Sequence, residues 1–291
     1  MPKKLGSSLL LLSFLASPFA AVGSGDPAVT ALDELNSRIA ELGLPFSVST
    51  MHMLGSGDAM GRTVLRSDHG NKQLSADWAP YDPYRGGRSD ITFVIDTFDV
   101  TPDIDLENQF EDVRNGLKVW AGQSCSDLEI TEIPGNTFNS TDLGAVQFIA
   151  GGGLRGGSLE TVELGTSLGA VDIVHGGFLP SWFFDAIACG AAEPGCGSDI
   201  LGVAFTIVWS DPAIGLPPQD SDSNRREDVA FRELYYNSEV TWVGGDGGER
   251  GSGEFNFPVV AVHESGHALS RGHFGDVSIH HKKGLTTKSL F

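Results

Sequence analysis

The fold is most strongly indicated near the C-terminal end, where residues 263–273 read His-Glu-Ser-Gly-His-Ala-Leu-Ser-Arg-Gly-His. The stretch is an H-E-x-x-H pattern followed by a third histidine. Residues four apart share one face of a helix, so His263 and His267 can present two imidazole nitrogens to one zinc ion. Glu264 stands beside the first ligand, where it can reach a water on the metal. This is the general-base position of a metallopeptidase.

His273 is the expected third zinc ligand. A helix continued as far as His273 would carry its side chain away from the other two histidines, so the chain must turn, and Gly272 is expected to supply the break. The preceding residues 256–262 are apolar, with Pro258 at a plausible first helical position, which predicts a buried helix. Buried histidines need partners, and a metal ion is one. The alternative is an ordinary core helix whose histidines are satisfied by protein groups.

Composition places the chain among exported globular proteins. Its 291 residues, 40% of them hydrophobic, suffice for one large domain or a domain plus an extension. Lys3 and Lys4, an apolar stretch over 5–15 and small residues up to Gly23 are typical of a secretory signal peptide, too short to span a bilayer comfortably. We therefore expect a secreted, extracellular protein, monomeric and free of the membrane once the signal is removed.

Charge and cysteine usage narrow the expected partners and compartment. The formal net charge of −19 disfavours nucleic acid as a partner, because phosphate backbones would be repelled. Of the three cysteines, Cys189 and Cys196 bracket a short Gly/Ala/Pro loop, and in an exported protein they are expected to form a disulfide. Cys125 would then stay unpaired. The alternative is three buried or free thiols.

The periodicity of the chain predicts an α/β fold with a mixed, mostly parallel twisted sheet. An amphipathic helix is expected over 26–42, and a second helix is expected to start at 101–103. The order of elements around this second helix predicts parallel pairing. The expected strands are 91–95, 128–133, 145–150 and 201–209.

The chain is expected to divide into three parts. Residues 1–23 are the signal peptide, 24–88 an N-terminal extension or propeptide with weak periodicity, and 89–291 a catalytic domain.

An acidic loop before the last third of the chain has oxygen-bearing side chains at alternating positions. Asp220, Asp222, Asn224 and Asp228 occupy loop positions one, three, five and nine, which is the spacing of calcium-binding loops. Arg225 stands where such loops normally carry the turn glycine. The alternative is a plain acidic loop exposed to solvent.

Two blocks of sequence resemble the matrixin-type metallopeptidases of the metzincin clan. Residues 91–133 are similar to the first strand, helix and second strand of those catalytic domains, and residues 255–275 are similar to their zinc helix. A third segment, 175–180, is similar to one whose histidine binds a structural zinc in animal members, so His175 becomes a candidate. The resemblance implies a metzincin-like α+β fold and a zinc endopeptidase. It implies zinc bound by His263, His267 and His273, and Glu264 as the catalytic base.

The resemblance also implies a peptide or protein substrate, which would lie as an extended chain along an edge strand of the sheet. Three features depart from the family pattern. Ser270 replaces the first turn glycine, and residues 24–88 lack the cysteine that keeps family members latent, for which Asp58 could substitute as a carboxylate plug. No methionine follows Met60, whereas the family closes its site with a methionine turn, so the C-terminus is expected to be truncated. The alternatives are a disabled peptidase that binds zinc and calcium, and a zinc hydrolase with a non-peptide substrate.

Overall fold

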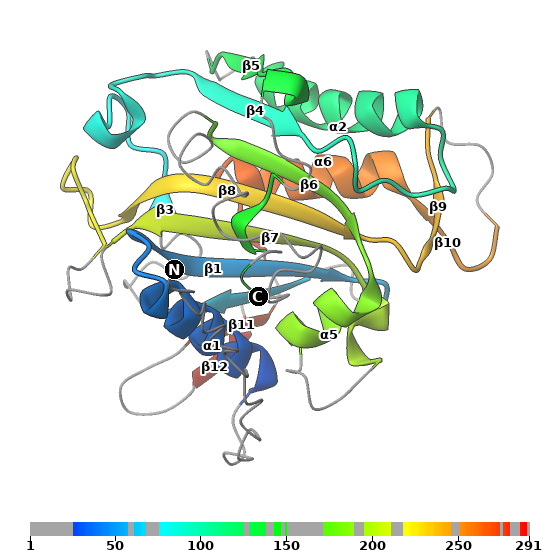
Figure 1. The fold of residues 1–291 in the computed structure, drawn as a ribbon, viewed down its shortest axis with the longest axis horizontal. Coiled ribbons are helices and arrows are strands. Elements are labelled where there is room, and N and C mark those ends of the chain that lie inside the picture. The colour runs from blue at the N-terminus through cyan, green and yellow to red at the C-terminus, as the bar shows by residue number, and fades with distance from the viewer. Residues whose placement is uncertain are drawn as a thin grey trace, which may run out of the picture.

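A single large mixed sheet forms the centre of the molecule in the computed structural model (Figure 1). The strand order is β12-β11-β2-β1-β7-β8-β6-β4-β5, with β3 paired to β8 outside this path. The described residues are 26–57, 61–67, 76–124, 128–137, 143–146, 149, 171–188, 195–210, 218–245, 251–273, 276–279 and 286–289.

The α/β class is confirmed, but the sheet is mixed rather than mostly parallel. Strands β5, β4, β6 and β8 run parallel, whereas β8, β7, β1 and β2 alternate in direction. The strands of the main sheet are β1 (Phe46–Gly55), β2 (Arg62–Leu65), β3 (Ala76–Asp77), β4 (Ile91–Ile95), β5 (Ile130–Glu132), β6 (Ile173–Leu179), β7 (Ile200–Trp209), β8 (Glu227–Asn237), β11 (Asp276–Ile279) and β12 (Thr286–Ser289). A separate parallel pair is formed by β9 (Thr241–Val243) and β10 (Glu254–Asn256).

Four α-helices among the described residues cover this sheet. They are α1 (Pro27–Glu41), α2 (Leu106–Ala121), α5 (Ser181–Ala188) and α6 (Phe257–Ala268), and short 3₁₀ turns occur at η1 (Pro83–Arg85), η2 (Gly135–Thr137) and η3 (Cys196–Asp199). In Figure 1, α2 and α6 lie next to each other, while α1 and α5 lie together on the other side of the molecule. None of the described helices is long and apolar enough to cross a membrane.

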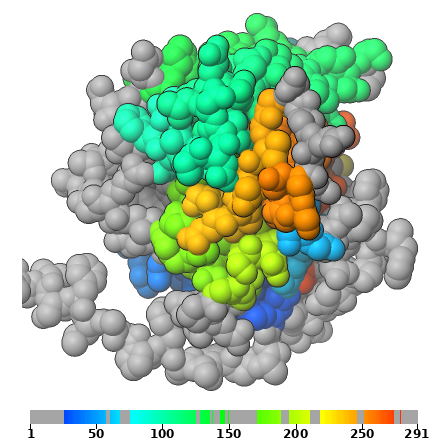
Figure 2. All heavy atoms as spheres, turned by 90° about the vertical axis from the view of Figure 1, so that its right-hand side faces the viewer, coloured from blue at the N-terminus to red at the C-terminus, as the bar shows by residue number. Residues whose placement is uncertain are grey.

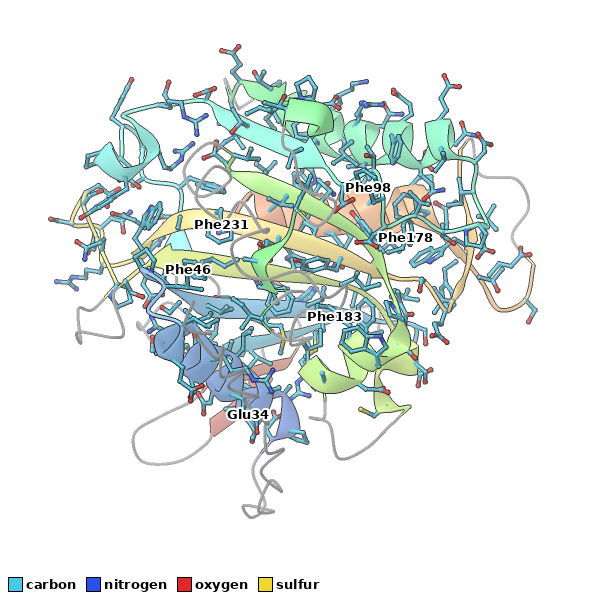
Figure 3. The ribbon with its side chains drawn as sticks, viewed as in Figure 1. Glu34, Phe46, Phe98, Phe178, Phe183 and Phe231 are labelled. Atoms are coloured by element: carbon cyan, nitrogen blue, oxygen red, sulfur yellow. The ribbon has the colours of Figure 1, made fainter. Side chains whose placement is uncertain are left out.

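Two hydrophobic cores lie on the two faces of the sheet, because successive side chains of a strand point to opposite faces. In β7, Val203 and Phe205 join the core beneath α1 and α5, whereas Ala204 joins the core beneath α2 and α6. The rings of Phe46 and Phe231 meet edge to face in the first core, with their centroids 5.4 Å apart (Figure 3). Both faces of the central strands are therefore covered.

The N-terminal region is built into this sheet. The helix expected over 26–42 is confirmed, and the side chain of Asp26 caps it by accepting from the backbone of Ala28. No strand was predicted between 43 and 88, yet β1 and β2 lie here. Nearly all of β1 is buried on both faces, so it lacks the alternation of apolar and polar residues that reveals a half-exposed strand. The predicted signal peptide lies outside the described residues.

Two predicted element positions were wrong. The second helix begins at Leu106, not at 101–103, because the side-chain amide of Gln109 bonds the backbone of Thr101 and holds the preceding residues in a turn. The strand predicted over 145–150 is helical at the residues described there. Its first turn is capped by the carboxylate of Glu233, which accepts from the backbone N–H groups of Ala145 and Val146.

Candidate metal centre

Helix α6 carries the H-E-x-x-H residues and is fixed by the sheet and by α2. Its N-cap is Asn256, whose side chain accepts from the backbone of Val259. The indole of Trp120 on α2 donates to the carbonyl of Val262 at 2.8 Å. Figure 2 shows the end of the molecule where the segment leading into α6, in orange, lies beside α2, in teal. The helix therefore presents its histidines from a rigid, buried position.

The three predicted zinc ligands converge on one point. The Nε2 atoms of His263, His267 and His273 form a triangle whose sides measure 2.9, 2.9 and 3.0 Å. Ligand nitrogens around a tetrahedral zinc lie about 3.4 Å apart, so this triangle needs only a small expansion to hold the ion. Three imidazole nitrogens that face one another cannot all find a hydrogen-bond partner within the group. A shared cation, in contrast, accepts the lone pair of each nitrogen. The donor set therefore fits zinc.

The other ring nitrogen of two ligands is held by a second bond. The Nδ1 atom of His267 donates to the carbonyl of Arg271 at 2.6 Å, and the Nδ1 atom of His273 lies 3.2 Å from the hydroxyl of Thr63. These bonds direct the Nε2 lone pairs toward the shared point. Burial lowers the pKa of His267 and of His263, which keeps both rings in the neutral form that binds metal.

The turn that brings His273 back is made by Ser270, and the expectation that Gly272 supplies the break was wrong. Ser270 has a φ of 68°, in the left-handed region, whereas Gly272 is not among the residues with positive φ. The hydroxyl of Ser270 accepts from the guanidinium of Arg232 at 2.8 Å, and the same guanidinium donates to the carbonyl of His267. The buried Arg232 thus stabilises the turn in place of the missing glycine.

Glu264 follows His263 on α6, and its side chain is fully buried. Its exposure is 0%, and within the part of the chain that the structure describes neither of its carboxylate oxygens has a hydrogen-bond partner. Gly202 of β7 packs directly on it, since a Cβ atom at this position would lie 2.8 Å from Oε1. Burial raises the pKa of Glu264 well above its usual value. A buried carboxylate without a donor is the kind of group that a metal-bound water would satisfy.

A fourth histidine, which the sequence reasoning missed, reaches the cluster from β1. The ring of His52 stacks on that of His267, with centroids 4.2 Å apart and planes inclined by 1°. Its Nδ1 atom lies 3.0 Å from the hydroxyl of Thr63, the group that also contacts His273. Ligand atoms of His52, His267 and His273 lie within 4.8 Å of one another. Nothing in the local sequence marks His52, because it is brought here by strand pairing alone.

His175 lies apart from this cluster and packs as a core residue. It is 1% exposed, and its Nδ1 atom lies 3.2 Å from the hydroxyl of Tyr236. No group of three or more His, Cys, Asp or Glu side chains among the described residues includes it. The structural zinc suggested for His175 therefore gains no support from these residues.

The acidic loop brings together three of the four side chains predicted for calcium. Carboxylate oxygens of Asp220, Asp222 and Asp228 lie within 4.8 Å of one another. Asn224 turns its amide nitrogen, not its oxygen, toward Asp222, at 3.0 Å. Arg225 has a φ of 71°, the left-handed conformation that a turn glycine usually adopts. That Asn224 is a calcium ligand remains a prediction.

Cys196 is disulfide-bonded. Both other cysteines, Cys125 and Cys189, lie outside the described residues, so the pairing of Cys189 with Cys196 stays a prediction. Asp58 also lies outside them.

Comparisons of this chain with protein-family models, with curated proteins and with solved structures find no match.

Proposed function

We propose that this protein is a secreted zinc-dependent metalloendopeptidase of the matrixin type. The observation that carries the proposal is the convergence of three Nε2 atoms, 2.9–3.0 Å apart. The residue after His263, Glu264, adds a buried carboxylate that has no hydrogen-bond partner among the described residues. Structural zinc sites do not require such a carboxylate, whereas a hydrolytic site needs a base next to the metal.

The roles of the residues follow from this arrangement. His263, His267 and His273 would hold the zinc. When bound, zinc polarises the scissile carbonyl and lowers the pKa of its bound water to about 7. Glu264 takes the proton of the attacking water and passes it to the leaving amine.

The substrate would be an extended peptide paired with β7, whose Gly202 packs on Glu264. Both edges of β7 are already paired, one with β8 and the other with β1 over the whole length from Phe46 to Gly55. His52, on β1, lies opposite Ala204 and contacts the ring of His267. We therefore propose that the chain containing β1 is the latent form, in which β1 occupies the substrate position.

A second candidate function rests on His52. Catalytic zinc sites keep an open position, whereas structural sites are closed by four protein ligands. If the fourth position is filled permanently by His52, the protein is a non-catalytic zinc-binding domain. The two candidate functions differ in whether His52 is a permanent ligand of the zinc.

The deciding experiment combines metal analysis with two variants of the full chain. For the peptidase, wild type binds one zinc per chain, and His263→Ala loses it. His52→Ala keeps the zinc, because His52 is not a required ligand. Loss of the bound zinc in His52→Ala, to the same extent as in His263→Ala, would favour the closed site instead, because loss of an outer-shell contact lowers metal affinity by only about 10–100-fold.

Hydrolysis of an unfolded protein substrate tests the chemistry. Limited proteolysis that removes the 46–55 segment should switch cleavage on, and the same treatment of Glu264→Gln should leave it at least about 100-fold slower, because the base is gone. Equal zinc content and equal unfolding temperature in the two proteins exclude a folding defect. Equal cleavage by both would contradict the mechanism, and cleavage by intact chain would contradict latency.

A further inference from the structure

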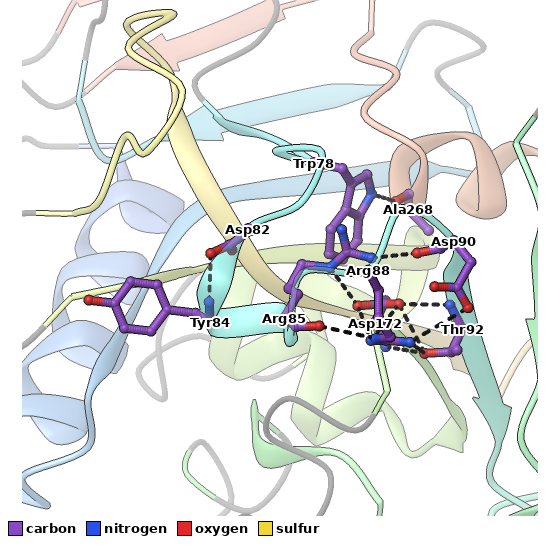
Figure 4. Close-up of polar contacts among 9 residues, drawn as sticks. All are labelled: Trp78, Asp82, Tyr84, Arg85, Arg88, Asp90, Thr92, Asp172 and Ala268. Atoms are coloured by element: carbon purple, nitrogen blue, oxygen red, sulfur yellow. Dashed lines mark hydrogen bonds and ion pairs between the residues drawn. The ribbon is translucent and has the colours of Figure 1, made fainter.

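The last turn of α6 ends in carbonyl groups that need donors from outside the helix. The final four carbonyls of a helix lack an intrahelical partner, and a buried carbonyl without a donor is costly. The carbonyl of Ala268, the last residue of α6, accepts from the indole Nε1 of Trp78 at 2.9 Å (Figure 4). The carbonyl of His267 accepts from the guanidinium of Arg232. Two side chains from distant segments therefore close the end of the zinc helix.

Trp78 also contacts the arginine that holds the zinc turn. The Cζ atom of Arg232 lies 5.6 Å from the centre of the Trp78 ring, within the roughly 6 Å of a cation–π interaction. Arg232 is only 2% exposed, and it donates to the hydroxyl of Ser270 and, at 3.4 Å, to the carbonyl of Ala76. Because its ring lies beside this buried positive charge, Trp78 stabilises Arg232 in the position from which it reaches the turn.

A second buried arginine fixes Trp78 itself. The Cζ atom of Arg85 lies 4.9 Å from the centre of the same ring, and Arg85 is 2% exposed. Its Nε atom donates to the carboxylate of Asp172 at 2.8 Å (Figure 4). The backbone carbonyl of Asp172 accepts in turn from the backbone of Arg232 at 2.8 Å. Trp78 is thus held between two arginines that are themselves connected through Asp172.

The turn after α6 decides where the third zinc ligand lies. The backbone N–H groups of Ser270 and Arg271 donate to carbonyls of the last turn of α6 at 3.0 and 2.9 Å. The φ of Ser270 is 68°, a conformation that a residue other than glycine keeps only when its surroundings hold it. Trp78 and Arg232 provide these surroundings. Because His273 follows three residues after Ser270, the direction in which the chain leaves α6 sets the position of its ring.

We propose that Trp78 is a positioning residue of the zinc site, which orders the turn leading to His273 before a metal binds. The inference rests on the proposed function in taking His263, His267 and His273 as the zinc ligands. Residues 76–88, which the sequence assigns to the N-terminal extension, would then act together with the catalytic domain. An activating cut that releases β1 must therefore leave Trp78 attached.

Hydrogen exchange of the full chain after metal removal tests the inference without peptidase activity. In zinc-free wild type, the amides of Ser270 and Arg271 should exchange as slowly as those of α6, because side chains and not the metal order the turn. Trp78→Phe keeps an aromatic ring beside the two arginines but has no N–H donor. In this variant the two amides should exchange about 10-fold faster, the factor that corresponds to one hydrogen bond, while the amides of β7 stay unchanged.

Metal binding gives the second readout. Trp78→Phe should bind zinc about 10-fold more weakly than wild type in competition with a chelator, as expected when a residue that supports a ligand is lost. With cobalt in place of zinc, the visible absorption spectrum should also change, because it reports the geometry of the bound nitrogens. A residue needed only for folding would leave that spectrum unchanged. Trp182→Phe makes the same substitution on α5, in the region of the other core, and should change neither zinc affinity nor spectrum.

The possible outcomes separate this inference from the proposed function. Rapid exchange of the Ser270 and Arg271 amides in zinc-free wild type would overturn the inference, because the metal would then order the turn. Equal exchange and equal zinc affinity in wild type and Trp78→Phe would also overturn it, as would faster exchange of β7 together with the turn. An ordered turn in a wild type that binds no zinc would contradict the proposed function, while the role of Trp78 in ordering the turn would stand.

Discussion

Two histidines of the metal cluster, His52 and His273, are fixed by a contact that lies outside their own sequence neighbourhood. The hydroxyl of Thr63 lies between the rings of His52 and His273, and Arg232 holds the turn at Ser270. A serine in the left-handed region costs about 1 kcal/mol, and a hydrogen bond from a charged donor offsets this with about 1.5–3 kcal/mol. The turn therefore forms without glycine, because a distant arginine stabilises it.

The burial of His175 predicts how the free energy of unfolding changes at low pH. Burial lowers its pKa to about 3, well below that of an exposed histidine. Below pH 6.5 the unfolded chain binds a proton that the folded chain does not, so this residue reduces the free energy of unfolding as the pH falls. The loss is about 1.4 kcal/mol per pH unit and continues down to the folded-state pKa.

The measurement is urea unfolding between pH 7.5 and pH 4.5 of wild type and His175→Gln, whose amide can still meet the hydroxyl of Tyr236. The difference between the two proteins should be constant above about pH 7 and shift in favour of the variant below it. Parallel curves over the whole range would show that His175 does not stay neutral in the fold.

At the scale of elements, the zinc helix is positioned by close contact with α2. A Cβ atom at Gly116 would lie 3.0 Å from the carbonyl of Ala261, and one at Gly266 would lie 2.7 Å from the ring of Trp120. The two helices approach closely because glycines stand at the contact. The same glycines weaken each helix in isolation, so packing rather than propensity stabilises α6.

Gly266→Ala should therefore destabilise the protein, although alanine is the better helix former. We expect a loss of about 1–3 kcal/mol in the free energy of unfolding, since Trp120 must move, together with weaker zinc binding as α6 shifts. Denaturant unfolding and zinc titration measure the two effects. Gly57→Ala is the matched control, because no atom lies within 4 Å of its Cβ position and its φ is not positive. A Gly266→Ala protein as stable as this control would contradict the packing argument.

At the scale of the whole molecule, the N-terminal region and the remainder share one sheet. Strand β1 pairs with β7 along its length, and α1 packs in the same core as β1 and α5. A buried ion pair between Arg85 and Asp172 joins the segment after β3 to the residue that precedes β6 (Figure 4). If β1 is the latent lid of the site, cutting the chain makes its release irreversible, because the freed segment can diffuse away.

Hydrogen exchange tests this integration. The amides of β1 should exchange as slowly as those of β7, since the same ladder of bonds protects both strands. Mass spectrometry of peptides covering 46–55 and 200–209 in the intact chain measures this directly. Fast exchange confined to 46–55 would mean that β1 opens without cutting, and the lid would then be reversible.

The sequence predicted those features of the protein that depend on residues close together in the chain. The spacing of His263 and His267 on a helix, the capped helix after Asp26 and the buried strand β7 follow from periodicity and capping, which act over a few residues. The signal peptide and the pairing of Cys189 are also sequence-based predictions, and they lie outside the described residues.

Tertiary structure alone decided the rest. His52 joins the metal cluster through pairing of strands far apart in the chain, and Ser270 takes the place of Gly272 because Arg232 reaches it. The sheet is mixed because β1 and β7 pair antiparallel with their neighbours. Strand β1 is buried on both faces and carries no alternation from which the sequence could predict it. Contacts between distant residues depend on which surfaces pack together, and no short window of sequence contains that information.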